Sequence, residues 1–493
     1  MRTTLFTPFL YLCRSLFGFY KTWNSTLDTF ISNFTCAANC STMKNFPSFF
    51  ILLLSITAFN FVKGLSQPRI ISGPMLGPVE LRDAKVWVEV SPEVKVVSLQ
   101  YNKRGDSKSK TIIYKGELGN DFNPIYFTVG GLDFNTTYEY KIWVNGKPTL
   151  KGGELTTKDL WQWRKQPPEF SFLTGSCSYF NEPVYDRPGK PYGKDSSIFE
   201  TMAKEKAAFM LWLGDAWYTR EVDYYSEWGL WNRASHDRAT TITQNFLKAM
   251  PQFAIWDDHD YGPNDIGKTY ILKDASRTVF NKYFCNPSSG ENGQGTYTMN
   301  SWGDVDVFMT DDRWWRSADA LKDSINGKPN PEKRMLGAQQ MEWLKESLLY
   351  SKAAFKIIAV GSQVLNPVSP FDSWWNFPAE YDELMNFLKE YKIEGVLFLT
   401  GDRHHSEIIK IDRPGTYPLY DITVSPLTST GYPFGQKEKN NPYRVIGFDV
   451  KQNYGKFSFS GIRGYRKLTV SFLGLKGENL GEWSVTEKEL KTP

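Results

Sequence analysis

The alternation of short apolar runs with amphipathic stretches after Pro168 constrains the fold of this chain more than any other feature of its sequence. The apolar runs have the length of buried strands, and they are Phe170–Leu173, Phe209–Leu213, Phe253–Trp256, Val305–Met309, Phe355–Val360 and Val396–Leu399. Amphipathic pieces such as Gln339–Leu349 and Glu380–Tyr391 lie between several of them and predict helices. We therefore expect a layered α/β or α+β domain over residues 168–493, with a strand-rich tail at 443–489 that closes the sheet edge.

The part of the chain before this domain has the pattern of an all-β fold. Polar and apolar residues alternate in Ala84–Val90 and Tyr138–Val144, and turn-rich pieces such as Lys103–Ser107 separate these runs. The passage Gly131–Tyr138 resembles the corner before a late strand in fibronectin type III sandwiches. A chain of 493 residues exceeds the usual size of one hydrophobic core. We therefore expect a small fibronectin-III-like β-sandwich over residues 68–158 in front of the larger domain.

Residues 1–66 have the features of a leader that ends in a signal peptide. Met43 opens a short basic start, an apolar run follows over residues 49–62, and small residues lie beyond it. These are the parts of a secretory signal, and the apolar run is short for a membrane span. We therefore expect translation to start at Met43, cleavage between about Gly64 and Gln67, and an exported protein, periplasmic or extracellular, with no stable membrane span afterwards. An uncleaved, anchoring signal is the alternative.

Charge and cysteine content argue against two classes of protein. Lysine and arginine number 58 against 54 aspartates and glutamates, a net charge of +4, so there is no electrostatic signal for binding nucleic acid. Once the leader is removed, only Cys177 and Cys285 remain, so the chain is not a disulfide scaffold. Either these two cysteines pair with each other or one of them has another task.

Side chains that can bind metals follow four of the predicted strands. The segments are Gly175–Cys177, Gly214–Tyr218, Asp257–Asp260 and Gly401–His405. In sheets with helical crossovers, ligands bind beyond the carboxyl ends of the strands, so we expect these side chains to converge. Three of the four histidines in the chain, His259, His404 and His405, lie in these segments, whereas His236 does not.

Each of these residues alone has a structural explanation. Asp215 could cap a helix or a turn, Cys177 could be a small buried apolar residue or half of a disulfide, and Tyr218 could pack in the core. A thiol, a phenol, carboxylates and imidazoles together at one end of one sheet instead fit the needs of phosphate-ester hydrolysis. Two or more metals about 3.5–4 Å apart lower the pKa of a bridging water and neutralise the phosphoryl group. Hard oxygen ligands suit Ca²⁺ or Mg²⁺, and the thiolate–phenolate–imidazole set favours a more Lewis-acidic transition metal.

The motifs together resemble one family of enzymes. The order Gly-Ser-Cys, Gly-Asp-x-x-Tyr, Trp-Asp-Asp-His-Asp and Gly-Asp-x-His is similar to that of the alkaline phosphatase D (PhoD-like) family of metallophosphoesterases, which is related to purple acid phosphatases. Asp312–Arg316 and Gly337–Leu344 are also similar to that family. The resemblance implies an exported chain with a sandwich in front of a calcineurin-like metallophosphoesterase domain, in which a sandwich of β-sheets is flanked by helices.

The resemblance also implies a metal-binding role for six strand-end residues. It implies an Fe³⁺ ion held by Cys177, Asp215, Tyr218 and His404. Asp215 would bridge to a second site for one or two Ca²⁺ ions, completed by Asp258 and Asp402, and other divalent metals are possible there.

Further residues would act on the substrate. The resemblance implies that His259 stands outside the metals near the leaving group and is steadied by Asp260. Arg313, Arg316 or Arg403 would hold phosphate oxygens.

Two segments depart from the family pattern. The wider superfamily has a lone histidine after a central strand, where this chain has Gln363, so Gln363 or a water could take its place. Tyr261–Asp265 also differs, which leaves a third metal and the substrate pocket open.

The expected function is that of an exported phosphoesterase, in which a metal-activated hydroxide attacks the phosphorus of a small phosphate ester. A phosphodiesterase or phospholipase of the same fold is the close alternative, and the oligomeric state is open. The Trp-rich loops either shape a pocket for an organic group or simply pack; they carry Trp314, Trp315, Trp374 and Trp375. A non-catalytic protein that binds glycans at the cell surface is less favoured, because such a module has no need for six metal ligands.

Overall fold

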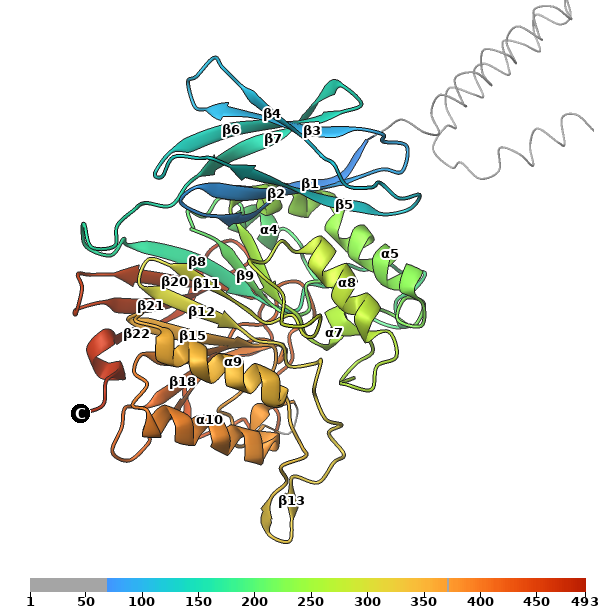
Figure 1. Cartoon of the computed structure of the whole chain (residues 1–493). Helices are drawn as coiled ribbons and strands as arrows, with labels where there is room; N and C mark the ends of the chain where they lie inside the picture. Colours follow the sequence, from blue (N-terminus) through green and yellow to red (C-terminus); the bar gives the residue numbers. More distant parts are fainter. Residues whose placement is uncertain (1–68, 370–371) are drawn as a thin grey trace, which may run out of the picture. The chain divides into compact units, whose positions relative to one another are not determined.

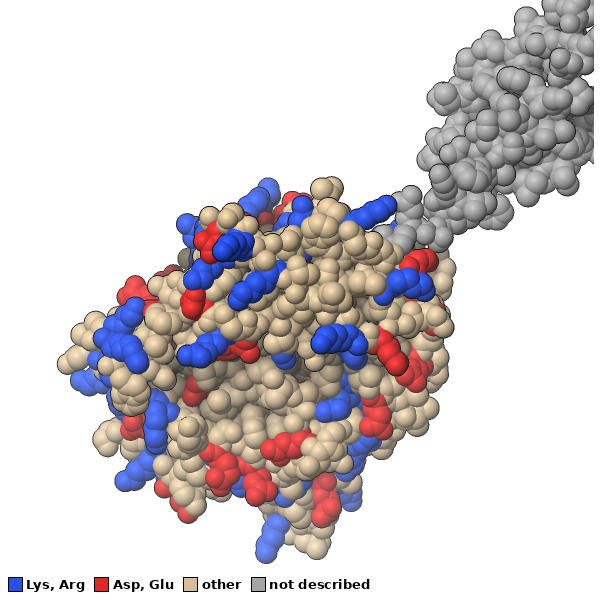
Figure 2. Space-filling model, turned by 45° about the horizontal axis from the view of Figure 1, so that its top comes forward, with Lys and Arg blue, Asp and Glu red and all other residues tan. Residues whose placement is uncertain are grey.

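The computed structural model describes residues 69–369 and 372–493. The predicted leader and its start at Met43 lie outside the described residues. Across these two described ranges, no helix is long and apolar enough to cross a membrane. On the face drawn in Figure 2, basic and acidic side chains are interspersed, in line with the small net charge of +4.

Seven strands form two antiparallel sheets at the beginning of the described chain. The sheets have the orders β1-β2-β5 and β4-β3-β6-β7. The strands are β1 (Ile70–Val79), β2 (Asp83–Val90), β3 (Val97–Lys103), β4 (Lys110–Ile113), β5 (Asn123–Gly130), β6 (Thr137–Val144) and β7 (Lys147–Thr156). Alternate residues of β3, β5 and β6 are buried, and side chains from both sheets, such as Val86 and Ile142, share one core. The domain boundaries and the fibronectin type III likeness stay predictions.

Two larger mixed sheets follow in the chain. One has the order β10-β9-β8-β20-β21-β22 and the other β11-β12-β15-β16-β18-β17-β19. The first comprises β8 (Phe170–Gly175), β9 (Met210–Leu213), β10 (Gln252–Ile255), β20 (Asn453–Ser460), β21 (Lys467–Gly474) and β22 (Asn479–Thr486). The second comprises β11 (Thr298–Trp302), β12 (Val305–Met309), β15 (Phe355–Val360), β16 (Val396–Thr400), β17 (Ser406–Ile411), β18 (Leu419–Thr423) and β19 (Arg444–Phe448). A short hairpin joins β13 (Ser324–Ile325) to β14 (Lys328–Pro329).

Helices cover the outer faces of these two sheets (Figure 1). On the six-stranded side lie α4 (Ile198–Met202), α5 (Glu227–Arg238), α6 (Gln244–Ala249), α7 (Asp258–Tyr261) and α8 (Lys273–Tyr283). On the seven-stranded side lie α9 (Gly337–Tyr350) and α10 (Pro378–Glu390). Short 3₁₀ turns are η1 (Thr241–Thr243), η2 (Trp374–Asn376) and η3 (Glu487–Leu490).

Strand β9 shows how the sequence builds these layers. Side chains alternate between the two faces of a strand. Leu211 and Leu213 join the core between the two sheets, whereas Met210 and Trp212 join the core under the helices. Because both faces are covered, the strand is apolar throughout, as its continuous apolar run predicts. The predicted α+β fold, with stacked sheets flanked by helices, is confirmed.

The predicted elements of this domain are found with small differences at their ends. The runs at Val305–Met309 and Phe355–Val360 match β12 and β15, and the two amphipathic pieces match α9 and α10. The tail contributes β19 at one edge of the seven-stranded sheet and β20, β21 and β22 to the six-stranded sheet. β20 pairs directly with β8, so the tail completes the sheet that carries the first predicted motif.

Buried contacts join the first sandwich to the rest of the chain. The Glu89 carboxylate on β2 accepts hydrogen bonds from Ser235 Oγ at 2.7 Å and Tyr283 Oη at 2.8 Å. The indole N–H of Trp87 donates to the carbonyl oxygen of Lys282 at 2.7 Å. The sandwich and the larger domain therefore belong to one compact unit.

Candidate metal centre

Four strand ends bring the predicted residues together. Cys177 follows β8, Asp215 follows β9, Asp258 lies just beyond β10, and Asp402 and His404 follow β16. The strands β8, β9 and β10 are parallel neighbours, so their carboxyl ends meet at one edge of their sheet. Possible ligand atoms from these four ends form groups whose members lie within 4.8 Å of one another. The convergence expected from the sequence is therefore present.

The backbone at four of these residues adopts the left-handed region. The φ angle is 61° at Cys177, 53° at Asp215, 64° at Asp402 and 56° at His404. Residues other than glycine adopt such angles rarely, at a cost of about 1–3 kcal/mol each. Four of them in one cluster indicate turns that aim side chains inward, with the surrounding packing offsetting the strain.

Glycines let the strand-end loops approach one another. A Cβ on Gly214, whose φ is 88°, would lie 2.4 Å from the Cβ of Asp257. A Cβ on Gly401 would lie 2.6 Å from the carbonyl oxygen of Leu213. The glycine before each aspartate of the two Gly-Asp motifs is therefore a steric requirement.

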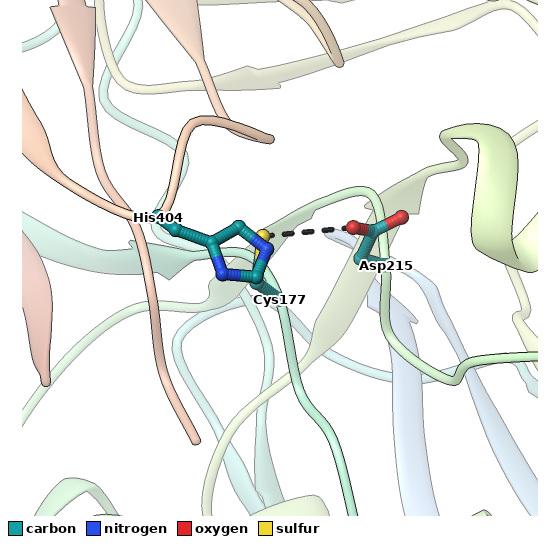
Figure 3. Close-up of side chains that lie close together, drawn as sticks. All are labelled: Cys177, Asp215 and His404. Atoms are coloured by element: carbon teal, nitrogen blue, oxygen red, sulfur yellow. Dashed lines mark hydrogen bonds between the residues drawn. The ribbon is translucent and has the colours of Figure 1, made fainter. Parts of the chain in front are cut away.

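One group of donors consists of Cys177, Asp215 and His404, which are all buried. The Cys177 thiol donates to Oδ2 of Asp215 over 3.5 Å, and the imidazole of His404 lies on the other side of the sulfur (Figure 3). Burial raises the pKa of the Cys177 thiol to about 11. Burial, with the Cys177 thiol and nearby carboxylates, also raises the pKa of Asp215 well above its usual value. Ionising both groups at neutral pH therefore requires a positive charge beside them.

His404 offers one ring nitrogen to this group. Its Nδ1 lies 2.6 Å from the carbonyl oxygen of Thr430, which can only accept, so Nδ1 carries the proton. The free lone pair is then on Nε2, and the hydroxyl of Tyr218 lies 3.3 Å from it. Burial lowers the pKa of His404, which keeps the ring neutral and Nε2 available to a metal.

A second group contains only carboxylates, those of Asp257, Asp258 and Asp402. Burial raises the pKa of Asp402 to about 7, and the charge of Asp258 adds to this. Burial also opposes ionisation of Asp258, but His259 and Arg313 outweigh it and lower the Asp258 pKa to about 2. The group is therefore crowded with negative charge that one arginine only partly offsets.

The two groups fit bound cations. Oδ1 of Asp215 and Oδ1 of Asp258 are buried, and neither has a hydrogen-bond partner among the described residues. Buried carboxylate oxygens normally find a donor or a cation. Asp215 also belongs to a group with Asp258 and His259, and Asp258 is a member of the carboxylate group. Asp215 therefore links the first donor group to the second. Thiol, phenol and imidazole suit a transition metal, and a carboxylate set suits a hard cation such as Ca²⁺.

Asp260 is engaged with backbone rather than with His259. Its Oδ2 accepts the backbone N–H groups of Asp215 at 2.5 Å and Asp257 at 3.0 Å, and its Oδ1 accepts those of Ala216 and Trp217. In the described part of the chain, no hydrogen bond joins Asp260 to His259, so the predicted pairing is not among its contacts. The carboxylate instead anchors the loop that presents Asp215.

His259 lies beside the two donor groups. Its ring packs against that of Tyr218 at an angle of 31°, with centroids 4.1 Å apart, and its Nε2 lies 3.9 Å from Oδ2 of Asp258. Burial lowers its pKa, against the charge of Asp258. Because a ring nitrogen also falls in the group with Asp215 and Asp258, His259 is close enough to be a ligand as well as an acid.

Arg313 and Arg316 are buried and bound to carboxylates. Arg313 pairs with Asp257 and, at 3.0 Å, with Asp372, whose other oxygen lies 2.6 Å from Arg316. Arg316 also pairs with Asp319 at 2.7 Å. Neither arginine lines the cleft beside the donors. Both guanidinium groups are therefore bound by aspartate side chains and do not line the cleft.

Arg403 and Gln363 belong to a buried polar network. Arg403 donates to Gln363 Oε1 and, at 2.7 Å, to Glu438 Oε1. The amide of Gln363 donates to Glu407 Oε1 at 2.8 Å. His405, Glu407 and Glu438 form a further group with metal-ligand spacing, but their carboxylates already accept these hydrogen bonds. Gln363 is fully buried in this network, and Arg403 also reaches the cleft.

A cleft of about 780 Å³ gives access to the second group. It is lined by Asp402, Arg403 and His404 and by the acidic residues Asp265 and Asp372, among others. The cleft therefore opens directly onto two of the predicted ligands.

The Trp-rich loops mostly pack. Trp314 and Trp374 are buried in hydrophobic cores, Trp315 packs against one of them, and Trp375 is 40% exposed. None of the four lines the cleft. Trp314 and Trp374 therefore pack in the core and do not shape a pocket for an organic group.

The two cysteines of the described residues, Cys177 and Cys285, are both free and buried. Cys285 lies in the core under the helices, and its pKa is raised to about 12 by burial. The disulfide alternative for Cys177 is therefore not what the structure shows, and its thiol remains available to the donor group.

Sequence reasoning missed two carboxylates of the site. Asp257 directly precedes Asp258, and this position in the Asp-Asp-His-Asp motif was a signal that its carboxylate lies close by. Asp372, which bridges Arg313 and Arg316, lies in a loop without any motif. Its place follows only from tertiary packing.

Comparisons with known proteins agree with this geometry. A sequence model of the PhoD-like phosphatase family matches residues 172–472, a range that contains every residue predicted for the site. The chain is 25% identical over 384 residues to alkaline phosphatase D of Bacillus subtilis (strain 168), a match that covers 65% of this chain and 62% of that protein. The match thus spans less than two thirds of the relative's length.

A solved structure of PhoD has the same fold. The two superpose with a TM-score of 0.66 at 19% identity, over 84% of this chain and 88% of the other. The family match itself extends over more than half of the 493 residues. The chain therefore belongs to the PhoD-like phosphatase family.

Proposed function

We propose that this chain is an exported, metal-dependent phosphoesterase that hydrolyses small phosphate esters. The observation that carries the proposal is that Asp215 belongs to two groups of donors, one with Cys177 and His404 and one with Asp258 and His259, beside an open cleft. The similarity to a protein named alkaline phosphatase D supports phosphate esters as the substrate class. Export, to the periplasm or the cell exterior, rests on the signal-like segment that begins at Met43.

The donor chemistry supports two kinds of metal. Fe³⁺ would be held by Cys177, Asp215, Tyr218 and His404. One or two Ca²⁺ ions would be held by Asp215, Asp258 and Asp402, and other divalent metals remain candidates for that site. When bound, the ions would supply the nucleophile and neutralise the phosphoryl oxygens.

The protein's own side chains would position the reactants. The hydrogen bond from Nδ1 to Thr430 fixes the tautomer of His404, and Asp260 fixes the loop of Asp215. Arg403 reaches the cleft between two ligands and is held by Glu438, so it is the arginine best placed to bind a phosphate oxygen. Of the three arginines that the sequence offered for this role, we therefore propose Arg403.

His259 would assist departure of the leaving group. Its Nδ1 is buried, and no hydrogen-bond partner for it is found in the described chain. Because burial lowers its pKa, the ring is neutral at neutral pH and donates through one N–H. A hydrogen bond from this N–H to the departing oxygen is the use that this placement supports.

A phosphodiesterase is the second candidate. The cleft of about 780 Å³ is large for a bare phosphate and leaves room for a second organic group. Assays of a monoester and a diester in parallel, with 4-nitrophenyl phosphate and bis(4-nitrophenyl) phosphate, distinguish the two candidates by their relative kcat/KM.

The same assays test the metal requirement. We expect chelation to abolish hydrolysis and return of Fe³⁺ and Ca²⁺ to restore it. Asp215→Asn should not be restored, because it removes a charge shared by two cations. Asp412→Asn, which changes a carboxylate that is 80% exposed, should behave as the wild type. Full activity after complete removal of metals would contradict the proposal.

A further inference from the structure

One serine hydroxyl joins two of the residues that would hold the iron ion. Ser425 lies just beyond β18, and its hydroxyl oxygen accepts the backbone N–H of His404 at 3.0 Å. The same hydroxyl donates its proton to Sγ of Cys177 at 3.2 Å. Cys177 follows β8 and His404 follows β16, so one fully buried side chain connects two strand ends of the candidate metal centre.

The sulfur is the acceptor of the Ser425 proton. A serine hydroxyl carries one proton, and Sγ of Cys177 is the acceptor that it meets in the described part of the chain. The hydroxyl of Ser176 lies 3.4 Å from the same sulfur, but it also donates to the carbonyl oxygen of Val424 at 3.1 Å. Ser425 is therefore the hydroxyl whose single proton points to the sulfur.

The backbone of Ser425 is anchored beside Cys177. Its N–H donates to Oγ of Ser406 at 3.0 Å, and its carbonyl oxygen accepts from the amide of Asn453 at 3.0 Å. Further along the same segment, the backbone N–H of Ser429 donates to the carbonyl oxygen of Cys177 at 3.1 Å. Such supporting contacts are typical of residues that orient metal ligands.

A hydrogen bond to a thiolate changes the properties of the ion that the thiolate binds. Hydrogen bonds to an ionised acceptor are about twice as strong as those between neutral groups, so this contact should strengthen when Cys177 is a thiolate. The donor draws negative charge from the sulfur, which weakens the bond from sulfur to metal and favours the reduced state of the ion. Hydrogen bonding around a cysteine sulfur tunes the reduction potential of blue-copper and iron–sulfur sites.

We propose that Ser425 tunes the iron site through its hydrogen bond to the sulfur of Cys177, without binding the ion itself. The inference rests on the proposed metal centre and adds a residue that lies in none of its sequence motifs. Ser425 is a positioning residue, because it acts through Cys177 and also fixes the backbone of His404.

The test compares Ser425→Ala with the wild type, both loaded with iron. The measurements are the iron–sulfur stretching frequency by resonance Raman scattering, the wavelength of the thiolate-to-iron band and the reduction potential. Without the hydrogen bond the sulfur donates more strongly, so we expect a higher frequency, a longer wavelength and an Fe³⁺ state favoured about tenfold. For one electron, this factor is a fall of about 59 mV in the potential. The absence of the iron–sulfur band from Cys177→Ser assigns it.

Ser178→Ala is the matched control. It removes an equally buried hydroxyl next to Cys177, but that hydroxyl has no hydrogen-bond partner among the described residues. Its iron–sulfur frequency and potential should match those of the wild type. Ser425→Thr keeps a hydroxyl at the same place and should lie closer to the wild type than Ser425→Ala does.

A second measurement leaves the chain unchanged. Wild-type protein that is exchanged into D₂O before iron is added carries a deuteron on Ser425. Its iron–sulfur frequency should then differ from the value in H₂O, and an identical value would contradict the hydrogen bond. This comparison decides the question if thermal unfolding shows that Ser425→Ala has lost its fold.

The outcomes separate this inference from the metal centre itself. If Ser425→Ala binds iron with the frequency, band and potential of the wild type, the centre stands and the role of Ser425 is wrong. Lower stability without any spectral change would mean that Ser425 only satisfies the N–H of His404. An iron-loaded wild type without an iron–sulfur band would overturn both the assignment of Cys177 and this role. A wild type that binds no iron would contradict the proposed centre and this role with it.

Discussion

Within the Asp257–Asp260 segment, adjacent side chains have different surroundings. The Asp258 carboxylate has one oxygen without a hydrogen-bond partner in the described chain, whereas Asp260 accepts four backbone N–H groups. His259 lies between these two aspartates in the sequence, and its ring packs at an angle against that of Tyr218. The three residues should therefore respond to substitution in three different ways.

Asp260→Asn should act on the loop of Asp215. An asparagine would place an NH₂ group against backbone donors, and a buried group left unpaired costs about 1–3 kcal/mol. We expect the free energy of unfolding to fall by about 2 kcal/mol and metal retention to weaken, as measured by denaturant unfolding and metal titration. Unchanged stability and metal binding with a leaving-group-dependent rate loss would instead support the pairing with His259 that the sequence predicted.

His259→Ala should separate leaving-group assistance from metal binding. A positioned acid contributes about 10²–10⁴-fold, most for poor leaving groups. We expect bound metals to be retained and the rate loss to be far larger on an alkyl phosphate than on 4-nitrophenyl phosphate. His236→Ala is the control, because His236 is hydrogen-bonded to Asp237, away from the donor groups. Equal losses on both substrates would rule out the acid role, and loss of metal would make His259 a ligand.

At the scale of elements, the turn after β9 controls how closely its loop approaches that of β10. Gly214→Ala would force a Cβ to within 2.4 Å of the Asp257 Cβ, at a φ of 88°. Gly105→Ala has nearly the same φ, 87°, but its Cβ would meet nothing within 4 Å. The control should cost only the backbone strain, about 1–2 kcal/mol. Gly214→Ala should cost clearly more in denaturant unfolding and should lose metal; equal costs would show that the close approach is unimportant.

The elements of the large domain and the gathering of side chains at its strand ends could be predicted for a local reason. A buried strand is a continuous apolar run, and a Gly-Asp pair after it is visible in the same short window, as at β9 and β16. Asp260 was not predictable in the same way, because a carboxylate in a motif looks the same whether it accepts from an imidazole or from backbone. Tyr192 shows a further limit: its hydroxyl lies 3.4 Å from Nδ1 and 3.3 Å from Nε2 of His404, which is 212 residues away in the sequence.

The two arginines show the same limit. Arg313 and Arg316 lie in a motif similar to the family's, which made phosphate binding a reasonable expectation. Both arginines are bound by Asp372, which lies 59 residues after Arg313 and 56 residues after Arg316 in the sequence. No local pattern reports such a contact.

At the scale of the whole molecule, the crowded carboxylates should make the metal-free protein sensitive to alkaline pH. Burial raises the pKa of Asp402 and of Asp260 to about 7. A carboxyl group that binds its proton more tightly when folded stabilises the fold below its unfolded pKa of about 3.9, and this stabilisation is lost as the pH rises through about 7. The buried imidazoles of His259, His404 and His405 have lowered pKa values and act oppositely, and their opposing effect fades as the pH rises through the unfolded pKa of about 6.5.

Thermal unfolding at two pH values tests this balance. The metal-free protein should have a lower Tm at about pH 8 than at about pH 6.5, because four buried carboxyl groups with raised pKa values, those of Asp215, Asp257, Asp260 and Asp402, lose their protons toward pH 8 and outnumber the three opposing imidazoles. The metal-loaded protein should lose little Tm over the same range, because the cations hold the carboxylates ionised. A metal-free protein that becomes more stable with rising pH would mean that these carboxylates are not strained by their burial.

The central claim is that the strand ends after β8, β9, β10 and β16 form a metal centre joined at Asp215. Elemental analysis of purified, catalytically active protein tests it most directly, with Asp215→Asn analysed in parallel. The account predicts that the active wild type contains bound iron and calcium and that the variant loses both together with activity. A fully active wild-type protein that contains neither these nor any other metal would contradict it.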